Sequence, residues 1–401
     1  MSIATRAYFD ESIHFSKEED SVKDGIRTVS ATNYKKLKYP RWAPTWDSKQ
    51  ELAFHNPKPF AHTDRGYFGD PSFDSLFKET GAKAKKLTPK LGTEVTGIQL
   101  SKLTDRQKDD LALLVEQRGV VAFRSQDFKN LSFDELKKWG RYFGPLHVHP
   151  TSGAPLGESE FHLTFRRGDK LEQKRLLSKR LNNISFHSDV SYETQPPGIT
   201  LLTMLQTDAG GDTQFVDMIE AYDRLSPTLK KFIDKLQVSH TSKDQAWNSK
   251  KEGGITRKPS IDSIHPLVRY HPVLKKKALF INSSFSTKIL GLKDEESDFL
   301  LSFLINHTES CLDAHIRPSW DENTVVVWDN RRLIHTATLD WDSDSIRHSF
   351  RLTPLAERPV GSEEEFQAWT PEKEEEKIKH TEEYLQLTPE EYYNKFYANK
   401  T

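Results

Sequence analysis

A histidine and a carboxylate that could bind one metal ion stand two positions apart, at His187 and Asp189. Residues i and i+2 of a strand point to the same face, so both side chains converge on one point if 184–190 is extended. One imidazole and one carboxylate are two of the three ligands of the facial triad in non-haem Fe(II) oxygenases. The tripeptide alone is a weak signal, because a histidine beside a strand is more often a hydrogen-bonded structural residue than a ligand.

The third ligand that such a triad requires is a second histidine on a neighbouring strand, and His335 is the candidate. The apolar run 324–328 predicts a buried strand that leads into a turn ahead of this histidine. His335 follows His187 by 148 positions, enough chain to build the strands between two sides of a barrel. The sequence therefore predicts a metal site made of His187, Asp189 and His335. The same ligand types also suit hydrolytic zinc chemistry, which is the alternative at this point.

An alternating strand at 347–353 follows the second histidine and carries two arginines. Its period of two puts Arg347 and Arg351 on one face, about 13 Å apart, and His348 on the other. If the arginine face points inward, both cations need anionic partners, since unpaired buried charge is very costly. Bound carboxylate or sulfonate groups fit this need, because guanidinium groups bind them in a bidentate manner. The alternative is that the arginines face solvent and the His348 face is buried.

The rest of the chain predicts a mainly β fold with helical insertions. Capping boxes at Thr104 and Ser132 open two helices, and a strand is expected at 94–100. The other predicted strands are 120–123, 199–205, 212–216, 278–282, 324–328 and 347–353. Short strands without regular βαβ spacing favour an antiparallel barrel or sandwich. Residues 217–236 and 294–312 are expected as helical insertions on it.

Three parts are expected along the chain. Residues 1–80 show bursts of aromatic residues and proline with little periodicity, which predicts an irregular arm, partly disordered, that wraps the core. Residues 81–358 hold the predicted strands and form the main domain. Residues 359–401 are rich in Glu and Lys with scattered aromatic residues, which predicts a charged extension of surface helices.

Composition excludes several classes of protein. The formal charge of −1 over 401 residues argues against a broad nucleic-acid-binding surface. Cys311 is the single cysteine, which excludes an intrachain disulfide and a cysteine-rich zinc site and favours a reducing compartment. No run approaches the ~18 apolar residues of a membrane span, and residues 1–24 lack the apolar centre of a secretory signal. We expect a cytoplasmic protein with a small anionic substrate and no nucleic-acid or membrane partner.

Together these residues resemble the TauD/TfdA family of 2-oxoglutarate-dependent dioxygenases, in particular its fungal taurine/sulfonate branch. The resemblance covers about residues 87–354. Its ordered motifs, with matching spacing, are 88–97, 144–150, 210–213, 265–272 and the turn 328–331. The stretch 39–46 resembles the N-terminal extension of the fungal branch, a weaker match.

The resemblance implies a double-stranded β-helix (jelly-roll) core with helical insertions. It implies that Fe(II) is held by His187, Asp189 and His335, with 2-oxoglutarate and O2 as cosubstrates. Thr213 and Arg347 match the residues that bind the far carboxylate of 2-oxoglutarate.

For the substrate, Arg351, His149 and Asn183 match positions that line the pocket and bind the sulfonate or its neighbourhood in taurine dioxygenases. Ser152 departs from the family pattern, because the bacterial enzymes have a tyrosine three residues after the position of His149. This loss of bulk in the pocket predicts a larger or different sulfonate than taurine. Candidate pocket walls, each more often plain core, are Phe186, Phe215, Trp328 and Phe350.

The expected reaction hydroxylates the carbon next to the sulfonate, so that sulfite and an aldehyde are released together with succinate and CO2. The alternative within the family is the same chemistry on an alkyl sulfate, an aryloxyacetate, a purine or a secondary metabolite. A further alternative is a non-catalytic barrel whose extensions recruit partners. A homo-oligomer is expected by analogy with relatives alone.

Overall fold

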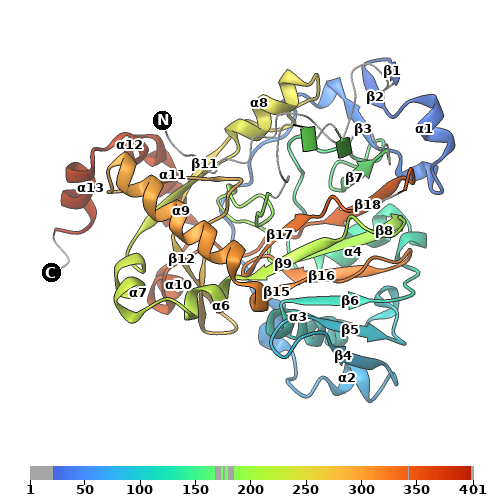
Figure 1. Ribbon diagram of the computed structural model, residues 1–401, viewed down its shortest axis with the longest axis horizontal. Helices are drawn as coiled ribbons and strands as arrows, with labels where there is room; N and C mark the ends of the chain where they lie inside the picture. Colours follow the sequence, from blue (N-terminus) through green and yellow to red (C-terminus); the bar gives the residue numbers. More distant parts are fainter. Residues whose placement is uncertain (1–20, 168–172, 175–176, 179–184, 342, 399–401) are drawn as a thin grey trace.

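The computed structural model describes residues 21–167, 173–174, 177–178, 185–341 and 343–398 (Figure 1). Helices take 34% of the described residues and strands 24%, so the expectation of a mainly β chain fits the centre of the molecule rather than the whole. The predicted substrate residue Asn183 and the first 20 residues of the arm lie outside the described residues.

The largest element is a seven-stranded sheet. In spatial order its strands are β4 (Lys83–Lys86), β5 (Thr93–Thr96), β6 (Val120–Phe123), β16 (Val325–Asp329), β8 (Ile199–Gln206), β18 (Arg347–Leu352) and β7 (His162–Arg166). Neighbouring strands are antiparallel, apart from the parallel pair β5–β6. Figure 1 shows β18 and β8 lying above β16, β6, β5 and β4. The strands predicted at 120–123, 199–205, 324–328 and 347–353 are confirmed to within one or two residues.

A smaller sheet packs against the large one. Its strands, in order, are β15 (His315–Ile316), β9 (Thr213–Asp217) and β17 (Leu333–Ala337). One apolar cluster joins the two sheets, with members that include Leu202, Met204, Val326 and Trp328 of the large sheet and Phe215 and Leu333 of the small one. Because alternate residues of a strand share a face, we call the layer between these two faces the inter-sheet space.

The outer face of each sheet is covered by other elements. The large sheet packs on α3 (Asp105–Arg118) and α4 (Phe133–Arg141) through a second apolar cluster. The small sheet packs on α6 (Met218–Asp223), α7 (Pro227–Ile233) and α9 (Asp294–Ser310) through a third. Both expected helical insertions are therefore confirmed. Since both sheets are covered on both faces, the inter-sheet space is shielded from solvent.

The helices α3 and α4 begin where the capping boxes predicted. The backbone N–H of Gln107 donates to Thr104 Oγ1 at 3.3 Å, and that of Glu135 donates to Ser132 Oγ at 3.2 Å. Gly119 ends α3 at a φ of 72°, a left-handed conformation that disfavours other residues. The chain thus turns directly from α3 into the buried strand β6.

Between β9 and β16 the chain builds a lobe around the small sheet. Its further elements are β10 (Gln237–Thr241), α8 (Lys243–Lys251), β11 (Asp262–Pro266), β12 (Val268–His271), β13 (Lys276–Leu279), β14 (Ser286–Ile289) and η6 (Leu312–Ala314). Strands β11, β10 and β14 form one sheet, and β12 and β13 form a hairpin. The strand predicted at 278–282 begins earlier and ends at Leu279.

The described part of the arm consists of short elements. They are β1 (Ser21–Lys23), β2 (Ile26–Thr28), α1 (Ala31–Lys35), η1 (Pro40–Trp42), β3 (Thr45–Asp47), η2 (Ser48–Gln50), η3 (Arg65–Phe68) and α2 (Asp74–Phe77). Two further short helices, η4 (Leu100–Lys102) and η5 (Phe128–Asn130), lie beyond the arm, in the main domain. Trp42 is fully buried and stacks on Phe350 of β18 at 4.1 Å between ring centroids. Phe350 therefore lies on the outer face of the large sheet, not in a pocket wall at the metal site.

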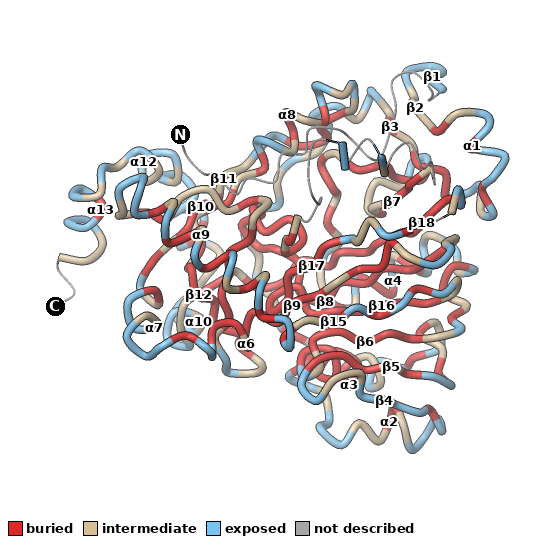
Figure 2. Tube along the Cα trace, viewed as in Figure 1, coloured by how far each residue is buried: buried red, intermediate tan, exposed pale blue. Residues whose placement is uncertain are grey.

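Up to residue 398, the C-terminal segment contains four helices: α10 (Glu363–Ala368), α11 (Pro371–Lys379), α12 (Thr381–Gln386) and α13 (Pro389–Phe396). Figure 2 shows long exposed stretches in α12 and α13, whereas the central strands are almost continuously buried. Tyr392 fixes α13 to the lobe, because its side chain is 1% exposed and its hydroxyl binds the side chain of Gln237.

Candidate metal centre

The side chains of His187, Asp189 and His335 meet at one edge of the inter-sheet space. One ligand atom from each lies within 4.8 Å of the others. The Nε2 atoms of His187 and His335 are both 3.6 Å from Asp189 Oδ1. The two imidazole ring centroids are 4.4 Å apart. The three residue types predicted from sequence are therefore close enough to bind a single ion.

The expected strand at 184–190 is wrong over its described part. His187 forms an isolated bridge with His335, and Asp189 lies in the turn that follows, where Val190 has a φ of 42°. His187 and Asp189 thus converge because a bridge and a turn bring them together, not because a regular strand alternates. His187 Nδ1 donates to the carbonyl of Ser185 at 2.9 Å, which leaves the lone pair on Nε2, the nitrogen that faces Asp189.

Asn330 holds the backbone of Asp189. Its Oδ1 accepts from the Asp189 N–H at 2.7 Å, and its Nδ2 donates to the Asp189 carbonyl at 3.1 Å and to the Pro197 carbonyl at 3.2 Å. Asn330 is fully buried in the turn between β16 and β17. The turn that leads to His335 therefore also positions Asp189.

The electrostatics of the cluster suit a cation. Burial alone would raise the pKa of Asp189, but Arg351, which binds its Oδ1, and His335 hold that pKa far below its usual range. Burial, followed by the neighbouring His187, lowers the pKa of His335 well below its usual value, so its imidazole is neutral. Asp189 Oδ2 and His335 Nε2 are buried without a hydrogen-bond partner among the described residues. A divalent ion would satisfy both atoms.

Arg347 lies on the same face of β18 as Arg351, inside the protein, so the alternative of solvent-facing arginines is wrong. Within the described part of the chain, no ion pair or hydrogen bond involves its guanidinium, and its Nε is buried. Burial, together with Arg351, lowers its pKa to about 10. Asp212 already binds Arg317 at 2.8 Å. Arg347 therefore has the properties of an anion-binding residue.

The remaining predicted site residues occupy buried positions. Thr213 and Phe215 of β9 are 5% and 1% exposed, and Phe215 packs on His335 at 5.6 Å between ring centroids. Phe215 thus braces a candidate ligand. His149 and Ser152 are both buried, and Ser152 Oγ lies 2.9 Å from His149 Nδ1.

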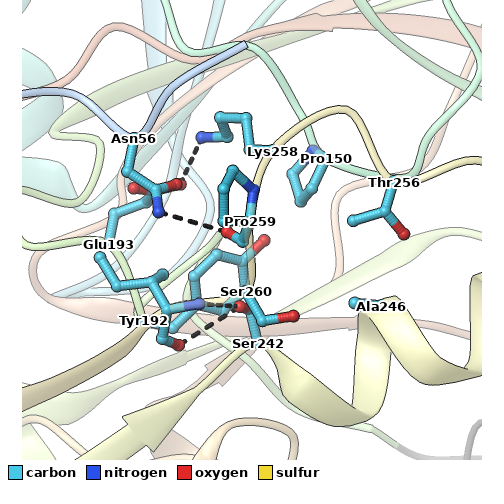
Figure 3. A pocket seen from close by; sticks show the side chains of 11 residues that line it. Asn56, Pro150, Tyr192, Glu193, Ser242, Ala246, Thr256, Lys258, Pro259 and Ser260 are labelled. Atoms are coloured by element: carbon cyan, nitrogen blue, oxygen red, sulfur yellow. Dashed lines mark hydrogen bonds and ion pairs between the residues drawn. The ribbon is translucent and has the colours of Figure 1, made fainter. Parts of the chain in front are cut away.

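A buried charged network supports the turn after Asp189. Glu193 Oε1 accepts from Lys258 Nζ at 2.6 Å and lies 2.7 Å from His147 Nε2. Burial would raise the pKa of Glu193, but Lys258 and His147 lower it to about 2. Figure 3 shows Lys258 and Glu193 pointing toward one another at a small pocket whose lining also includes Asn56 of the arm and Pro150. No motif or periodic pattern in the sequence pointed to Lys258.

A second set of metal-ligand types, His62, Asp64 and Glu357, also comes together. The buried guanidinium of Arg331 already binds both carboxylates of this set. It also pairs with Glu116 at 2.8 Å and Asp329 at 2.8 Å. This cluster is therefore an ion-pair network that fixes the turn carrying Asn330, and not a second metal site.

Comparisons with known proteins agree with this site. The family model described as "Taurine catabolism dioxygenase TauD, TfdA family" matches residues 83–353. The chain is 46% identical over 363 residues to the "Alpha-ketoglutarate-dependent sulfonate dioxygenase" of Saccharomyces cerevisiae, covering 88% of this chain and 87% of that protein. It is 40% identical to the "Alpha-ketoglutarate-dependent dioxygenase cnsM" of Penicillium expansum, over 81% and 91% of the two chains.

A crystal structure of a taurine dioxygenase from Burkholderia xenovorans superposes with a TM-score of 0.56 at 27% identity, covering 70% of this chain and 91% of that one. The fold and site define an Fe(II)- and 2-oxoglutarate-dependent dioxygenase. The chain belongs to the TauD/TfdA family, within its fungal sulfonate branch. Across the described residues, no helix is both long and apolar enough to cross a bilayer.

Proposed function

We propose that this dioxygenase acts on an organosulfonate, oxidising the carbon that carries the sulfonate. The observation that carries the proposal is the pair of arginines beside the metal cluster: Arg347 is a buried cation that forms no ion pair among the described residues, and Arg351 adjoins Asp189. Two anions, one from the cosubstrate and one from the substrate, fit this arrangement. The sulfonate assignment is supported by the 46% identical yeast protein, whose name specifies that substrate class.

In this proposal His187, Asp189 and His335 hold Fe(II). The donor set fits, because two imidazoles and one carboxylate make the facial triad. Bound Fe(II), with 2-oxoglutarate and O2, supplies the oxidising power that converts a C–H bond of the substrate to C–OH. The protein contributes orientation, and the burial of Asp189 and His335 limits the access of water, while the His187 side chain is 27% exposed.

Thr213 and Arg347 would bind the far carboxylate of 2-oxoglutarate. Arg347 offers a bidentate guanidinium, and the hydroxyl of Thr213 is a second donor from the facing sheet. Burial of Arg347 strengthens the preference for an anionic ligand, since the charge has lost its hydration.

Arg351 and His149 would bind the sulfonate. The third residue predicted for this role, Asn183, lies outside the described residues. Ser152 and Phe215 would shape the same pocket, and both are buried close to these groups or to His335. Hydroxylation next to the sulfonate gives a carbon that carries both a hydroxyl group and the sulfonate. Loss of the hydroxyl proton and cleavage of the C–S bond then yield an aldehyde and sulfite.

We further infer that the two facing sheets form the double-stranded β-helix core of the family, and that the enzyme works in the cytoplasm. The facing arrangement of β18, β8 and β16 with β9 and β17 supports the first inference. The single cysteine, Cys311, which is free, supports the second.

The test is turnover of a panel of sulfonates, alkyl sulfates and non-sulfur acids, with and without O2. We expect succinate and sulfite in equal amounts with a sulfonate, no product under nitrogen, and loss of both products in His187→Ala. Oxygen-dependent succinate without sulfite would instead identify an oxygenase of the same family with another substrate. Activity under nitrogen would identify hydrolytic chemistry.

A further inference from the structure

Three hydrogen-bond donors converge on one nitrogen of His149. The backbone N–H groups of Thr151 and Ser152 lie 3.2 and 3.0 Å from His149 Nδ1 and donate to it. The hydroxyl of Ser152 adds a third contact at 2.9 Å. A backbone N–H cannot accept, so Nδ1 must be the unprotonated nitrogen and the ring proton lies on Nε2.

The surroundings of His149 disfavour a second proton on its ring. Burial, followed by the neighbouring His162 of β7, lowers the pKa of His149 well below its usual value. The other charged and titratable groups around it are His147 on the same loop and Arg257 and Lys258 on the segment that follows α8. All of these neighbours repel an imidazolium, so the ring stays neutral with a single N–H donor.

Arg257 holds the loop that makes this arrangement. Its Nη1 donates to the carbonyls of His149, at 3.2 Å, and of Ser152, and its own backbone N–H donates to the Pro150 carbonyl at 2.8 Å. The guanidinium is 1% exposed and pairs with no carboxylate among the described residues. Its Nε donates to Gln50 Oε1 at 2.7 Å.

The N-terminal arm closes the same loop from the other side. Thr45 and Ala154 exchange two backbone hydrogen bonds, at 2.8 and 3.2 Å, and Trp46 Nε1 donates to the Thr151 carbonyl at 3.0 Å. Together with Gln50, these contacts make the arm part of the wall that fixes the His149 loop.

We propose that Ser152 and Arg257 are positioning residues that fix His149 as a neutral imidazole with its proton on Nε2, a fixed donor to one sulfonate oxygen. This inference rests on the proposed function for the identity of the anion. Besides its place in the pocket wall, Ser152 acts through its contact with His149, which gives a physical role to the serine that replaces the tyrosine of the bacterial enzymes. Because His149 is held neutral, sulfonate binding does not depend on its titration between pH 6 and 8.

The kinetic test compares Ser152→Ala with the wild-type enzyme. Loss of one hydrogen bond of typical strength predicts that KM for the sulfonate rises about fivefold, with kcat and KM for 2-oxoglutarate within twofold of wild type. The wild-type KM is expected to be flat from pH 6 to 8, whereas the KM of Ser152→Ala should fall toward pH 6, because Nδ1 has lost a donor and accepts a proton more readily, and the imidazolium then attracts the sulfonate. Arg257→Lys should raise the same KM, since an ammonium group cannot reach both carbonyls.

The matched control is Ser159→Ala, on the same connecting segment, because no hydrogen bond of the Ser159 hydroxyl is found within the described chain. A flat pH profile and an unchanged sulfonate KM in Ser152→Ala, equal to those of Ser159→Ala, would overturn the proposal. If Arg257→Lys does not fold, the KM of Ser152→Ala for the sulfonate still tests the proposal.

A second measurement keeps this inference separate from the proposed function. In the full chain with 15N-labelled histidine and diamagnetic Zn(II) in place of iron, NMR distinguishes the two ring nitrogens. We expect one signal pair with protonated Nε2 and bare Nδ1, constant from pH 6 to 8, that disappears in His149→Gln and shifts in Ser152→Ala. A proton on Nδ1, or a charged ring, would refute the positioning role. If wild type has this signal but releases no sulfite, the substrate assignment fails instead.

Discussion

The backbones of His187 and His335 are hydrogen bonded to each other in both directions, at 3.0 and 2.8 Å. The two imidazoles are therefore neighbours because the chain pairs there, independently of any ion. Asp189 reaches the same point because Asn330, in the turn before His335, holds its backbone on both sides. His335 thus lies on a strand, His187 in a bridge and Asp189 in a turn. These backbone contacts hold the three ligands in place before a metal ion binds.

Asn330→Ala should weaken metal binding. The variant removes three buried hydrogen bonds that fix Asp189 and the Pro197 carbonyl, and loss of such outer contacts typically costs about 10–100-fold in metal affinity. The measurement is a titration with Fe(II) under anaerobic conditions, followed by the absorbance of the complex with 2-oxoglutarate.

The control for this variant is Asn306→Ala on the exposed side of α9, which should bind metal as wild type does. Equal metal affinity in Asn330→Ala and Asn306→Ala would show that the turn does not position Asp189. A fall in thermal stability alone, without a change in affinity, would lead to the same conclusion.

Lysine substitutions at Arg347 and Arg351 should separate the two anion sites. A lysine keeps the charge but loses the bidentate geometry. Since a charged hydrogen bond contributes about 1.5–3 kcal/mol, we expect about 10–100-fold increases in KM. Arg347→Lys should raise KM for 2-oxoglutarate and leave that of the sulfonate nearly unchanged. Arg351→Lys should do the reverse. The measurement is steady-state kinetics in which 2-oxoglutarate and the sulfonate are varied in turn. If both variants raise both KM values alike, the two arginines do not form separate anion sites.

The part of this site that obeys strand periodicity could be predicted from the sequence. The arginine face of β18 and the approach to His335 follow from period two and a buried apolar strand. The geometry at Asp189 could not be predicted, because it depends on a turn with a positive φ at Val190 and on an asparagine 141 positions away. Long-range polar contacts of this kind leave no periodic trace.

The same limit applies to the arm. Its aromatic bursts indicated that it wraps the core, yet nothing local showed that Trp42 stacks on Phe350 or that Gln50 binds Arg257. The resemblance to a family supplied roles for individual residues that periodicity alone left open, such as those of Thr213 and His149.

Trp42→Ala should destabilise the protein strongly, by about 3–5 kcal/mol, because it leaves a cavity against the outer face of the large sheet. Trp42 is fully buried and touches the rings of Phe133, Phe161 and Phe350. The free energy of unfolding is measured in urea, with Trp247→Ala as the control because Trp247 is 68% exposed. Similar unfolding midpoints for the two variants would show that the arm does not stabilise the core.

Two buried histidines should make the folded state less stable in mild acid. Burial lowers the pKa of His348 to about 4 and that of His240 to about 3, against about 6.5 in an unfolded chain. Between pH 6.5 and 4 the unfolded state therefore binds more protons, so stability is fully present above pH 6.5 and falls as the pH drops through this window. Each histidine contributes a slope of up to about 1.4 kcal/mol per pH unit.

His348→Gln tests this contribution, because glutamine can still donate to the Trp42 carbonyl, which lies 2.9 Å from His348 Nε2. The free energy of unfolding, measured in urea from pH 4.5 to 7.5, should lose up to about 1.4 kcal/mol per pH unit of its slope below pH 6. His55→Gln, at an exposed position, is the matched control and should keep the wild-type slope. If the free energy of unfolding of His348→Gln and of His55→Gln has the same pH dependence, His348 takes up its proton in the folded protein as readily as in the unfolded one. This outcome would contradict the prediction.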